Sequence, residues 1–239
     1  MASIAPAGSG ENRLFSVLTR RDRKRVCDRA EPVTLSFGDI LCEPDRPYEH
    51  VYFPLTGFVS LVTDIAGHHP LEVGLIGNEG MLGATLALGV GTSPLRGVVQ
   101  GGGSALRLPT RQFERELVDS PALASTIRRY LYVLMAQLTQ TTVCTCFHEI
   151  QPRLARWLLM THDRAQVDSF HLTHQLLADM LGVRRSAVTI AAGTLQSTGL
   201  ISYTRGEITV VDRQGLEGMA CECYRAVIDD YARQFPSPH

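Results

Sequence analysis

The sequence predicts an α+β fold in which a β-rich N-terminal part, a long helix and a C-terminal helix-turn-helix with a β-hairpin follow one another. Three observations carry this prediction. Short β-prone runs separated by Gly, Pro, Asp and His occupy residues 32–108. A long helical pattern follows Ser120 and Pro121, and small and apolar residues recur at fixed positions from His174 to Thr194. The change from short runs to helical periodicity places the strands first and most of the helices after them.

Composition and charge bound the class of protein. The chain has 239 residues, of which 44% are hydrophobic and 20% charged, as in a globular protein of one large or two ordinary domains. The formal net charge of −1 excludes nucleic-acid binding through a bulk positive field, so any DNA affinity must come from a local patch and from pairing of two copies. The run 80–91 is too short and Gly-rich to span a bilayer, and the six cysteines lack disulfide-scaffold spacing. We therefore expect a cytoplasmic protein with no membrane partner and no secretory segment.

The first 119 residues predict short helices around a β-roll. Residues 1–10 are small and flexible in composition, which predicts a disordered tail. Apolar residues recur at helical spacing over 11–29, and the basic run 20–25 within it is typical of a solvated helix face. Regular short strands with turn signals favour an all-β barrel or roll over a parallel sheet. The β-prone runs are 33–35, 51–53, 58–62, 71–76 and 106–108.

A short helix over 110–118 precedes the long one, which starts at the N-cap and first-turn pair Ser120-Pro121. Apolar residues along the long helix lie on more than one side. The helix either packs only on the β-rich part, or it buries one face there and another on a second copy of the chain. The candidate dimerisation residues are Leu123, Ile127, Tyr130, Leu131, Leu134, Leu138 and Thr141.

The C-terminal third begins where Gln151-Pro152 interrupts helix continuity and marks a hinge. A helix over 153–162 surrounds the only tryptophan, Trp157, and another is predicted over 217–234. The runs 200–203 and 207–211 flank Thr204-Arg205-Gly206, which predicts a two-stranded wing with a turn-forming glycine.

The stretch from His174 to Thr194 has the spacing of a DNA-reading helix-turn-helix. Gly182 stands at the tight turn, where a residue free to adopt positive φ is favoured. In such motifs the N-terminal residues of the second helix face base edges in the major groove. Two amphipathic helices packed for stability alone are the alternative interpretation. The apolar or small positions are Leu177, Ala178, Leu181, Val183, Val188 and Ala191.

This order of parts resembles the Crp/Fnr family of bacterial transcription regulators over roughly Leu14 to Gly215. The motifs that carry the resemblance are 172–175 through 200–202, the glycine-bounded turn 77–83 and the strand-turn 37–41. The resemblance implies a homodimer that binds a double-stranded DNA operator, with RNA polymerase as a partner if the protein is an activator. It also implies these parts: a flexible tail (1–10), a cyclic-nucleotide-binding-like sensory β-roll (11–119), a dimerisation helix and hinge (120–150) and a winged helix-turn-helix DNA-binding domain (151–239).

Departures from the family pattern bear on the signal. Members that bind cyclic nucleotides carry a Gly-Glu-Leu turn whose Glu accepts from the ribose, whereas the matching turn here has Met81. Arg96 is followed by Gly97 instead of Ser, Thr or Ala, although an Arg with local N–H groups still suits an anion. Binding of cyclic AMP or cyclic GMP is therefore not expected, the effector is unknown and no cofactor is predicted. The candidate effector-binding residues are Gly80, Met81, Leu82, Gly83 and Arg96.

The second helix of the motif departs as well. The family often reads bases with Arg, then Glu, then a second Arg, whereas this chain has Arg185, Ser186 and Ile190. Arg185 still suits guanine O6 and N7, but the other two residues predict a different operator. Arg184, Thr173 and Arg205 are better suited to phosphate. The candidate DNA-binding residues are Arg185, Ser186, Thr189, Arg184, Thr173, His174 and Arg205.

Cysteines and histidines give no clear metal motif. Cys144-Thr145-Cys146 and Cys221-Glu222-Cys223 are Cys-x-Cys pairs, but residues two apart on a helix diverge, so neither pair is expected to chelate. The N-terminal cysteine cluster of oxygen-sensing family members is absent, and His68-His69 is expected to face water. Structural thiols are the preferred interpretation; a redox-sensing thiol and a metal or cluster site remain open.

No catalytic motif is present: the sequence lacks a phosphate-binding loop ending in Lys-Ser/Thr, Gly-x-Ser-x-Gly and His-Glu-x-x-His, and the run Gly101–Gly103 is expected to be a turn. The sequence therefore predicts a non-enzymatic DNA-binding regulator. The alternatives are a small-molecule sensor that acts through a protein partner and a redox or metal sensor on the same scaffold.

Overall fold

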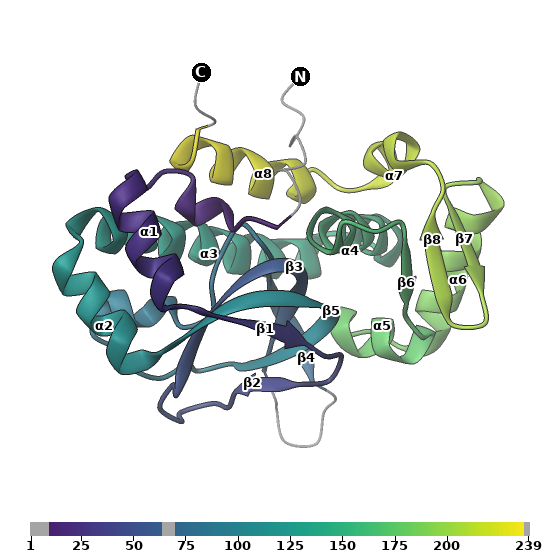
Figure 1. Ribbon diagram of the computed structural model, residues 1–239. Helices are drawn as coiled ribbons and strands as arrows, with labels where there is room; N and C mark the ends of the chain where they lie inside the picture. Colours follow the sequence, from purple (N-terminus) through teal and green to yellow (C-terminus); the bar gives the residue numbers. More distant parts are fainter. Residues whose placement is uncertain (1–9, 64–69, 237–239) are drawn as a thin grey trace. The chain divides into compact units, whose positions relative to one another are not determined.

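The computed structural model (Figure 1) describes residues 10–63 and 70–236. These residues cluster into two compact units. The predicted tail, apart from Gly10, and the pair His68-His69 lie outside the described residues. The units are, within the described ranges, Met1–Val59 with Ile76–Tyr132, and Ser60–Leu75 with Val133–His239. Each unit is described by itself below.

The first unit begins with η1 (Arg13–Phe15) and α1 (Arg20–Arg29), which confirms the short helices predicted over 11–29. Thr19 caps α1 by accepting a hydrogen bond from the Asp22 N–H. Within α1 only Val26 is buried. The next helices in this unit are η2 (Ala84–Leu88) and α2 (Thr110–Asp119), the second as predicted.

Two arginines on the basic face of α1 form ion pairs with a buried carboxylate. The fully buried carboxylate of Glu116 in α2 accepts from Arg25, with Nη2 to Oε2 at 2.8 Å, and also pairs with Arg29. A buried carboxylate without such partners would be strongly destabilising. The prediction of a purely solvated basic face is therefore wrong for Arg25, because its charge holds Glu116 inside the unit.

In the main sheet, β1 and β2 each pair with β5 in antiparallel orientation. Its order is β1-β5-β3-β4, with β2 paired to β5, which confirms a sheet of the roll type. Leu35 opposes Gly103, and Glu31 opposes Arg107. The strands are β1 (Glu31–Leu35), β2 (Ile40–Cys42), β3 (His50–Thr63), β4 (Leu71–Ile76) and β5 (Arg96–Pro109).

The expectation that Gly101–Gly103 forms a turn is wrong, because these residues continue β5. A Cβ on Gly101 would lie 2.3 Å from the Phe58 ring, and one on Gly103 would lie 2.3 Å from the Thr56 carbonyl oxygen. The glycines are thus required by a close approach of neighbouring segments.

The long helix is α3 (Pro121–Phe147), and Ser120 Oγ accepts from the Leu123 N–H as the predicted cap. In the second unit, Gln137 of α3 accepts from the Leu75 N–H at 2.7 Å and donates to the Leu75 carbonyl at 3.1 Å. The buried amide therefore satisfies both backbone groups of one β4 residue. None of the helices in the described ranges combines the length and apolar character needed to cross a bilayer.

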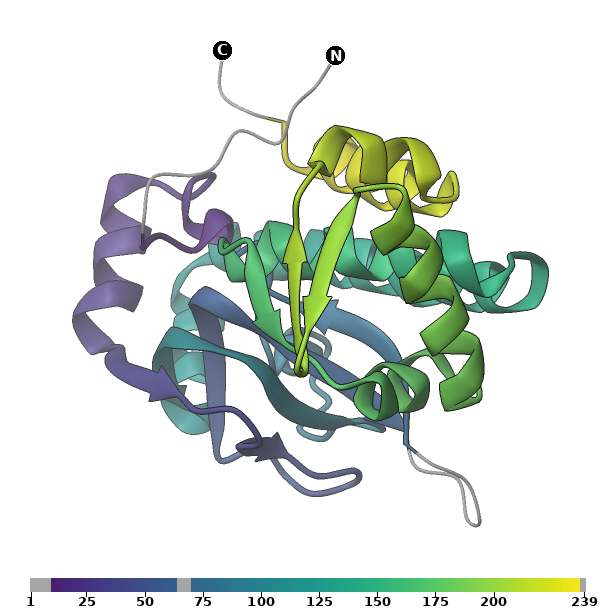
Figure 2. The same cartoon turned by 90° about the vertical axis from the view of Figure 1, so that its right-hand side faces the viewer.

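The rest of the second unit contains the predicted helix-turn-helix and wing. The strands form an antiparallel sheet of order β6-β8-β7 (Figure 2). β6 was not predicted, and it adds a third strand to the wing. The elements are α4 (Ile150–Ala165), β6 (Ser169–His171), α5 (His174–Leu181), α6 (Arg185–Ser197), β7 (Ile201–Thr204), β8 (Glu207–Val210), α7 (Arg213–Met219) and α8 (Cys223–Gln234).

Two predicted boundaries are wrong. Pro152 does not interrupt a helix; it lies in the first turn of α4, where its missing N–H costs nothing, and the break comes before Ile150. The helix predicted over 217–234 is two helices, because Ala220 is extended with ψ 150° and ends α7. The segment between α7 and α8 is therefore not helical, and its Cys221 side chain is buried.

A buried carboxylate joins β4 to α4 inside the second unit. Glu72 is 7% exposed, and it accepts from Trp157 Nε1 at 2.7 Å and from Ser60 Oγ at 2.5 Å. Burial raises the pKa of Glu72 to about 7, although the two hydrogen bonds and the nearby Arg164 oppose the rise.

The stability of the protein should consequently fall as pH rises from about 4.5, the ordinary Glu pKa, to about 7. The folded carboxyl binds its proton more tightly than the unfolded one, so its contribution is largest below that window and is lost through it. Glu72→Gln should remove on the order of 3 kcal/mol of this pH dependence. Urea unfolding across the window measures it, with the exposed Glu114→Gln as control. An unchanged pH profile in Glu72→Gln would contradict the interpretation.

Candidate nucleic-acid interface

The turn between α5 and α6 has the geometry that the sequence predicts. Gly182 has φ +63°, in the left-handed region, and its N–H donates to the Asp179 carbonyl at 3.2 Å. The Val183 N–H then donates to the Ala178 carbonyl at 3.0 Å. A Cβ at Gly182 would also lie 2.8 Å from Leu71 Cδ1. Glycine is therefore favoured twice at this position, by backbone conformation and by space.

The apolar positions of the motif pack α5 against α6. Five of the six predicted positions are buried, and Val183 is half-buried. Leu195, further along α6, is fully buried as well. Since one face of α6 is fixed against α5 and α4, the opposite face has to point outward. The buried predicted positions are Leu177, Ala178, Leu181, Val188 and Ala191.

The outward face of α6 carries the residues expected to contact DNA. Arg184, Arg185, Ser186 and Thr189 are exposed, and Ile190 is 72% exposed. Within the described residues, no hydrogen bond or ion pair engages the guanidinium groups of Arg184 and Arg185. A hollow between α5 and α6, lined by Gln175, Asp179, residues 182–187 and Ile190, runs along this face. Two free guanidiniums at a helix start suit phosphate and guanine acceptors.

The side chains of His174 and Thr189 are hydrogen-bonded to each other at the edge of this face. The His174 ring stacks on Tyr203 with centroids 4.2 Å apart, and its Nδ1 lies 3.0 Å from Thr189 Oγ1. Thr189 donates to the Arg185 carbonyl at 3.0 Å, so it accepts from His174. Burial and then the nearby Arg185 lower the pKa of His174, which favours the neutral ring. His174 thus links α5, α6 and the wing.

Thr173 and Arg205 flank this face. Thr173 is the N-cap of α5, and its Oγ1 accepts from the Leu176 N–H at 3.1 Å. The exposed Arg205 has φ +53° and Gly206 φ +86°, so the β7–β8 turn has two left-handed residues, as in a type I′ hairpin. The wing predicted from sequence is confirmed, and its tip presents a cation.

The residues expected to bind an effector are packed within the first unit. A Cβ on Gly80 would lie 2.2 Å from Tyr130 Oη, and the Gly80 carbonyl accepts from Asn12 at 2.8 Å. Met81 and Leu82 are buried, and Gly83 has φ +92° before η2. Arg96 pairs with Glu43, with Nε to Oε2 at 2.8 Å. Effector binding by this turn and Arg96 stays a prediction.

The candidate dimerisation residues divide into two groups. Leu123, Ile127 and Tyr130 are at most 2% exposed within the chain's own first unit. These three side chains already pack inside the chain, and their place in a dimer interface stays a prediction. Leu131, Leu134, Leu138 and Thr141 are only half-buried. Tyr132 (49%) and Met135 (58%) are exposed on the same helix, although neither was among the predicted dimerisation residues.

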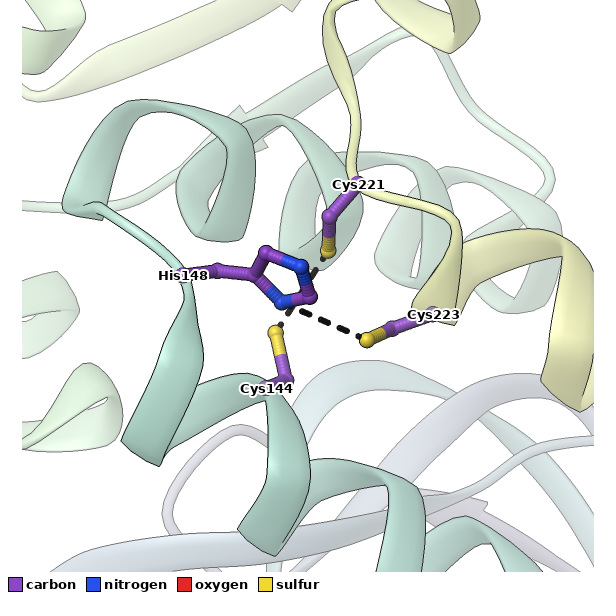
Figure 3. Close-up of side chains that lie close together, drawn as sticks. All are labelled: Cys144, His148, Cys221 and Cys223. Carbon is purple, nitrogen blue, oxygen red and sulfur yellow. Dashed lines mark hydrogen bonds between the residues drawn. The ribbon is translucent and has the colours of Figure 1, made fainter.

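Four side chains from distant segments converge within the second unit (Figure 3). The ligand atoms of Cys144, His148, Cys221 and Cys223 all lie within 4.8 Å of one another. Cys146 is exposed, so the first Cys-x-Cys pair diverges as expected. The second pair converges, because α7 ends before it and the two cysteines are not both inside a helix. The missed signal was the four-residue spacing of Cys144 and His148, whose N–H donates to the Cys144 carbonyl at 3.1 Å just beyond the end of α3.

The Cys144 thiol has a distinctive environment. Its Sγ lies 3.5 Å from Cys221 Sγ. A hydrogen bond from Cys221 and the positive charge of Arg156 lower the pKa of Cys144 to about 5, against the effect of burial. The same contact raises the pKa of Cys221. The pair therefore stabilises one thiolate.

Comparisons with known proteins agree with this geometry. Residues 152–219 match the model of the Crp-like helix-turn-helix domain. A curated relative, the global nitrogen regulator of Synechocystis sp., is 28% identical over 178 residues, 70% of this chain and 78% of that protein. FixK2 from Bradyrhizobium japonicum has a TM-score of 0.66 at 16% identity, over 80% of this chain and 98% of that one. A CRP/FNR transcriptional regulator from Thermus thermophilus has a TM-score of 0.65 at 22% identity, over 80% and 98%. The two structures show the shared fold.

Replacing the turn glycine should damage the motif. Gly182→Ala forces a side chain into the left-handed region, at roughly 1–2 kcal/mol, in addition to the contact with Leu71. We expect a lower midpoint of urea unfolding and weaker DNA binding in a fluorescence anisotropy assay. The matched control is Gly193→Ala in the interior of α6, where a Cβ meets open space and should stabilise the helix by about 0.5–1 kcal/mol. Equal stability of the two variants would show that the turn does not depend on positive φ.

Proposed function

We propose that this chain is a Crp/Fnr-type transcription regulator with a helix-turn-helix DNA-binding domain, and that it places the N-terminal turn of α6 in the major groove of its operator. The observation that carries the proposal is the pair Arg184 and Arg185. Both side chains are exposed at the start of a helix whose other face is fixed by packing. The relatives are transcription regulators, in agreement with the expectation that the chain is not an enzyme.

Within this surface the residues have separate roles. Arg185 is the base-reading residue, since its planar fork matches guanine O6 and N7. Ser186 and Ile190 offer a hydroxyl and an apolar contact, so the operator differs from one that is read by Glu and a second Arg. Arg184, Thr173 and Arg205 contact phosphates on either side. Thr173 keeps its hydroxyl hydrogen for a phosphate, because its oxygen accepts the cap bond.

Thr189 and His174 support the reading surface. The chain of hydrogen bonds from His174 through Thr189 to the Arg185 carbonyl fixes the first turn of α6. This arrangement leaves His174 without a direct contact to bases. Pre-organisation of this kind lowers the entropy lost when Arg185 binds.

A second copy of the chain is needed for affinity. A net charge of −1 supplies no bulk attraction to DNA, and paired reading heads double the local contacts. We propose that the exposed side of α3, with Tyr132, Met135 and the half-buried Leu131, Leu134 and Leu138, forms a two-fold interface. The operator is then two related half-sites.

The signal is a small molecule or chemical change other than cyclic AMP or cyclic GMP. The position at which the resemblance places a ribose-binding Glu holds Met81, which is fully buried. We also propose a cytoplasmic location, where the operator is accessible, and RNA polymerase as a partner if the protein activates transcription. A sensor that acts only through a protein partner is the alternative, and DNA binding separates the two.

The Arg185→Ala protein should lose sequence preference. We expect a loss of about 1–3 kcal/mol at one base position of the operator, with little change on scrambled DNA. Arg184→Ala is the matched comparison: it should weaken binding to all sequences and reduce the salt slope by about 1. Anisotropy titrations with the chain's own upstream region at several salt concentrations measure both effects. If Arg185→Ala binds operator and scrambled DNA as the wild type does, Arg185 does not read a base.

Met135→Glu should weaken the dimer. In a two-fold interface the introduced carboxylate would be buried among apolar side chains, close to the same carboxylate of the second copy. We therefore expect a rise of roughly tenfold or more in the dissociation constant of the dimer. Sedimentation equilibrium gives that constant. The control is Val118→Glu on α2, which is more exposed (81% against 58%) and is not one of the proposed interface residues. A wild-type constant for Met135→Glu, or an equal loss in both variants, would rule out this face.

A further inference from the structure

We propose that Cys144, His148, Cys221 and Cys223 bind one zinc ion, which ties the end of α3 to the start of α8. The four residues belong to the same unit, and Figure 3 shows their side chains pointing toward one another. They come from two segments 77 residues apart, which the fold brings together.

The distances suit a single tetrahedral ion. Cys144 Sγ and Cys221 Sγ are 3.5 Å apart, and Cys223 Sγ and His148 Nδ1 are also 3.5 Å apart. With Zn–S near 2.3 Å and Zn–N near 2.0–2.1 Å, the ligand atoms of a tetrahedral site lie roughly 3.6–3.8 Å apart. The longest separation of 4.8 Å therefore closes with small side-chain rotations.

The donor set selects the metal and the kind of site. Three thiolates and one imidazole form a structural zinc set, whereas oxygen-seeking ions such as Mg²⁺ and Ca²⁺ would not choose it. Four protein ligands complete the coordination, so no position is left for a substrate or a reactive water. The three cysteines are at most 7% exposed, as a closed structural site requires.

The surrounding groups are those that metal ligands need. His148 Nε2 lies 3.2 Å from Glu222 Oε1, which orients the ring so that Nδ1 faces the sulfurs. Gln140 Nε2 donates to Cys223 Sγ at 2.9 Å. Zinc with three thiolates carries one net negative charge, and the buried guanidiniums of Arg153 and Arg156 lie close enough to act on the cysteine thiols.

Two other interpretations use fewer of these residues. Buried cysteines often pack as small apolar side chains, but apolar packing does not account for an imidazole held with one nitrogen on a sulfur and the other on a carboxylate. A disulfide between Cys144 and Cys221 would leave Cys223, His148 and Glu222 without a role. The zinc site accounts for all of them.

Metal analysis of the full chain tests the proposal. The protein is purified without a histidine tag under reducing conditions, loaded with zinc and dialysed to remove unbound metal. We expect one zinc per chain by plasma mass spectrometry, and about none in Cys144→Ser, Cys221→Ser and Cys223→Ser. Cys146→Ser is the matched control, since that cysteine is two residues from Cys144 and exposed, and it should keep one equivalent. A chelator should lower the melting temperature of the wild type and of Cys146→Ser, but not that of the three ligand variants, which hold no zinc.

Cobalt substitution keeps the test open if a variant fails to fold. Added to the metal-free wild type, one equivalent of Co²⁺ should give thiolate charge-transfer and tetrahedral d–d bands, which one equivalent of Zn²⁺ abolishes. His148→Ala should shift the d–d bands by removing the nitrogen ligand. Wild-type protein that binds no zinc or cobalt overturns the proposal, as do iron in place of zinc, an equal loss in Cys146→Ser, or a Cys144–Cys221 disulfide in the protein as purified.

Discussion

The packing of α5 against α6 across the left-handed turn at Gly182 is the constraint on which the proposed DNA-contacting surface depends. Once Leu177 and Ala178 meet Val188 and Ala191 in a closed interior, the rotation of α6 about its own axis is fixed. The N-cap and first residue of α6 then face solvent whatever their identity, and in this chain they are Arg184 and Arg185. The residues proposed to read bases can therefore vary while the scaffold stays the same, as Ser186 and Ile190 illustrate.

The same unit accommodates polar groups by pairing each with a defined partner. Gln137 satisfies both backbone groups of Leu75, and Glu72 is held by Trp157 and Ser60. Buried groups of this kind specify one arrangement, because each alternative packing would leave a polar atom without a hydrogen bond. Glu72 adds a dependence on pH, since its neutral form is the one that burial favours.

The side chains of helix α3 have different surroundings along its length. Its beginning fills the core of the first unit with Leu123 and Ile127, its middle exposes Met135, and its end carries Cys144 toward the segment before α8. A metal at the cysteine cluster would add a covalent-like link to a helix end that otherwise depends on side-chain packing. The apolar residues on more than one side of this helix thus have separate physical explanations.

Local sequence determined the elements, and the tertiary structure decided which of their residues meet. The turn glycine, the apolar spacing of α5 and α6, the wing and the Ser120 cap were all predicted, because each depends on interactions within a few residues. Burial of Tyr130, continuation of β5 through Gly101–Gly103, and the pairing of Glu116 with Arg25 were not, because each needs a neighbour distant in the chain. The cysteine cluster shows the difference most clearly: Cys144 and His148 are brought together locally at the C-terminal end of α3, whereas only the fold brings Cys221 and Cys223 to them.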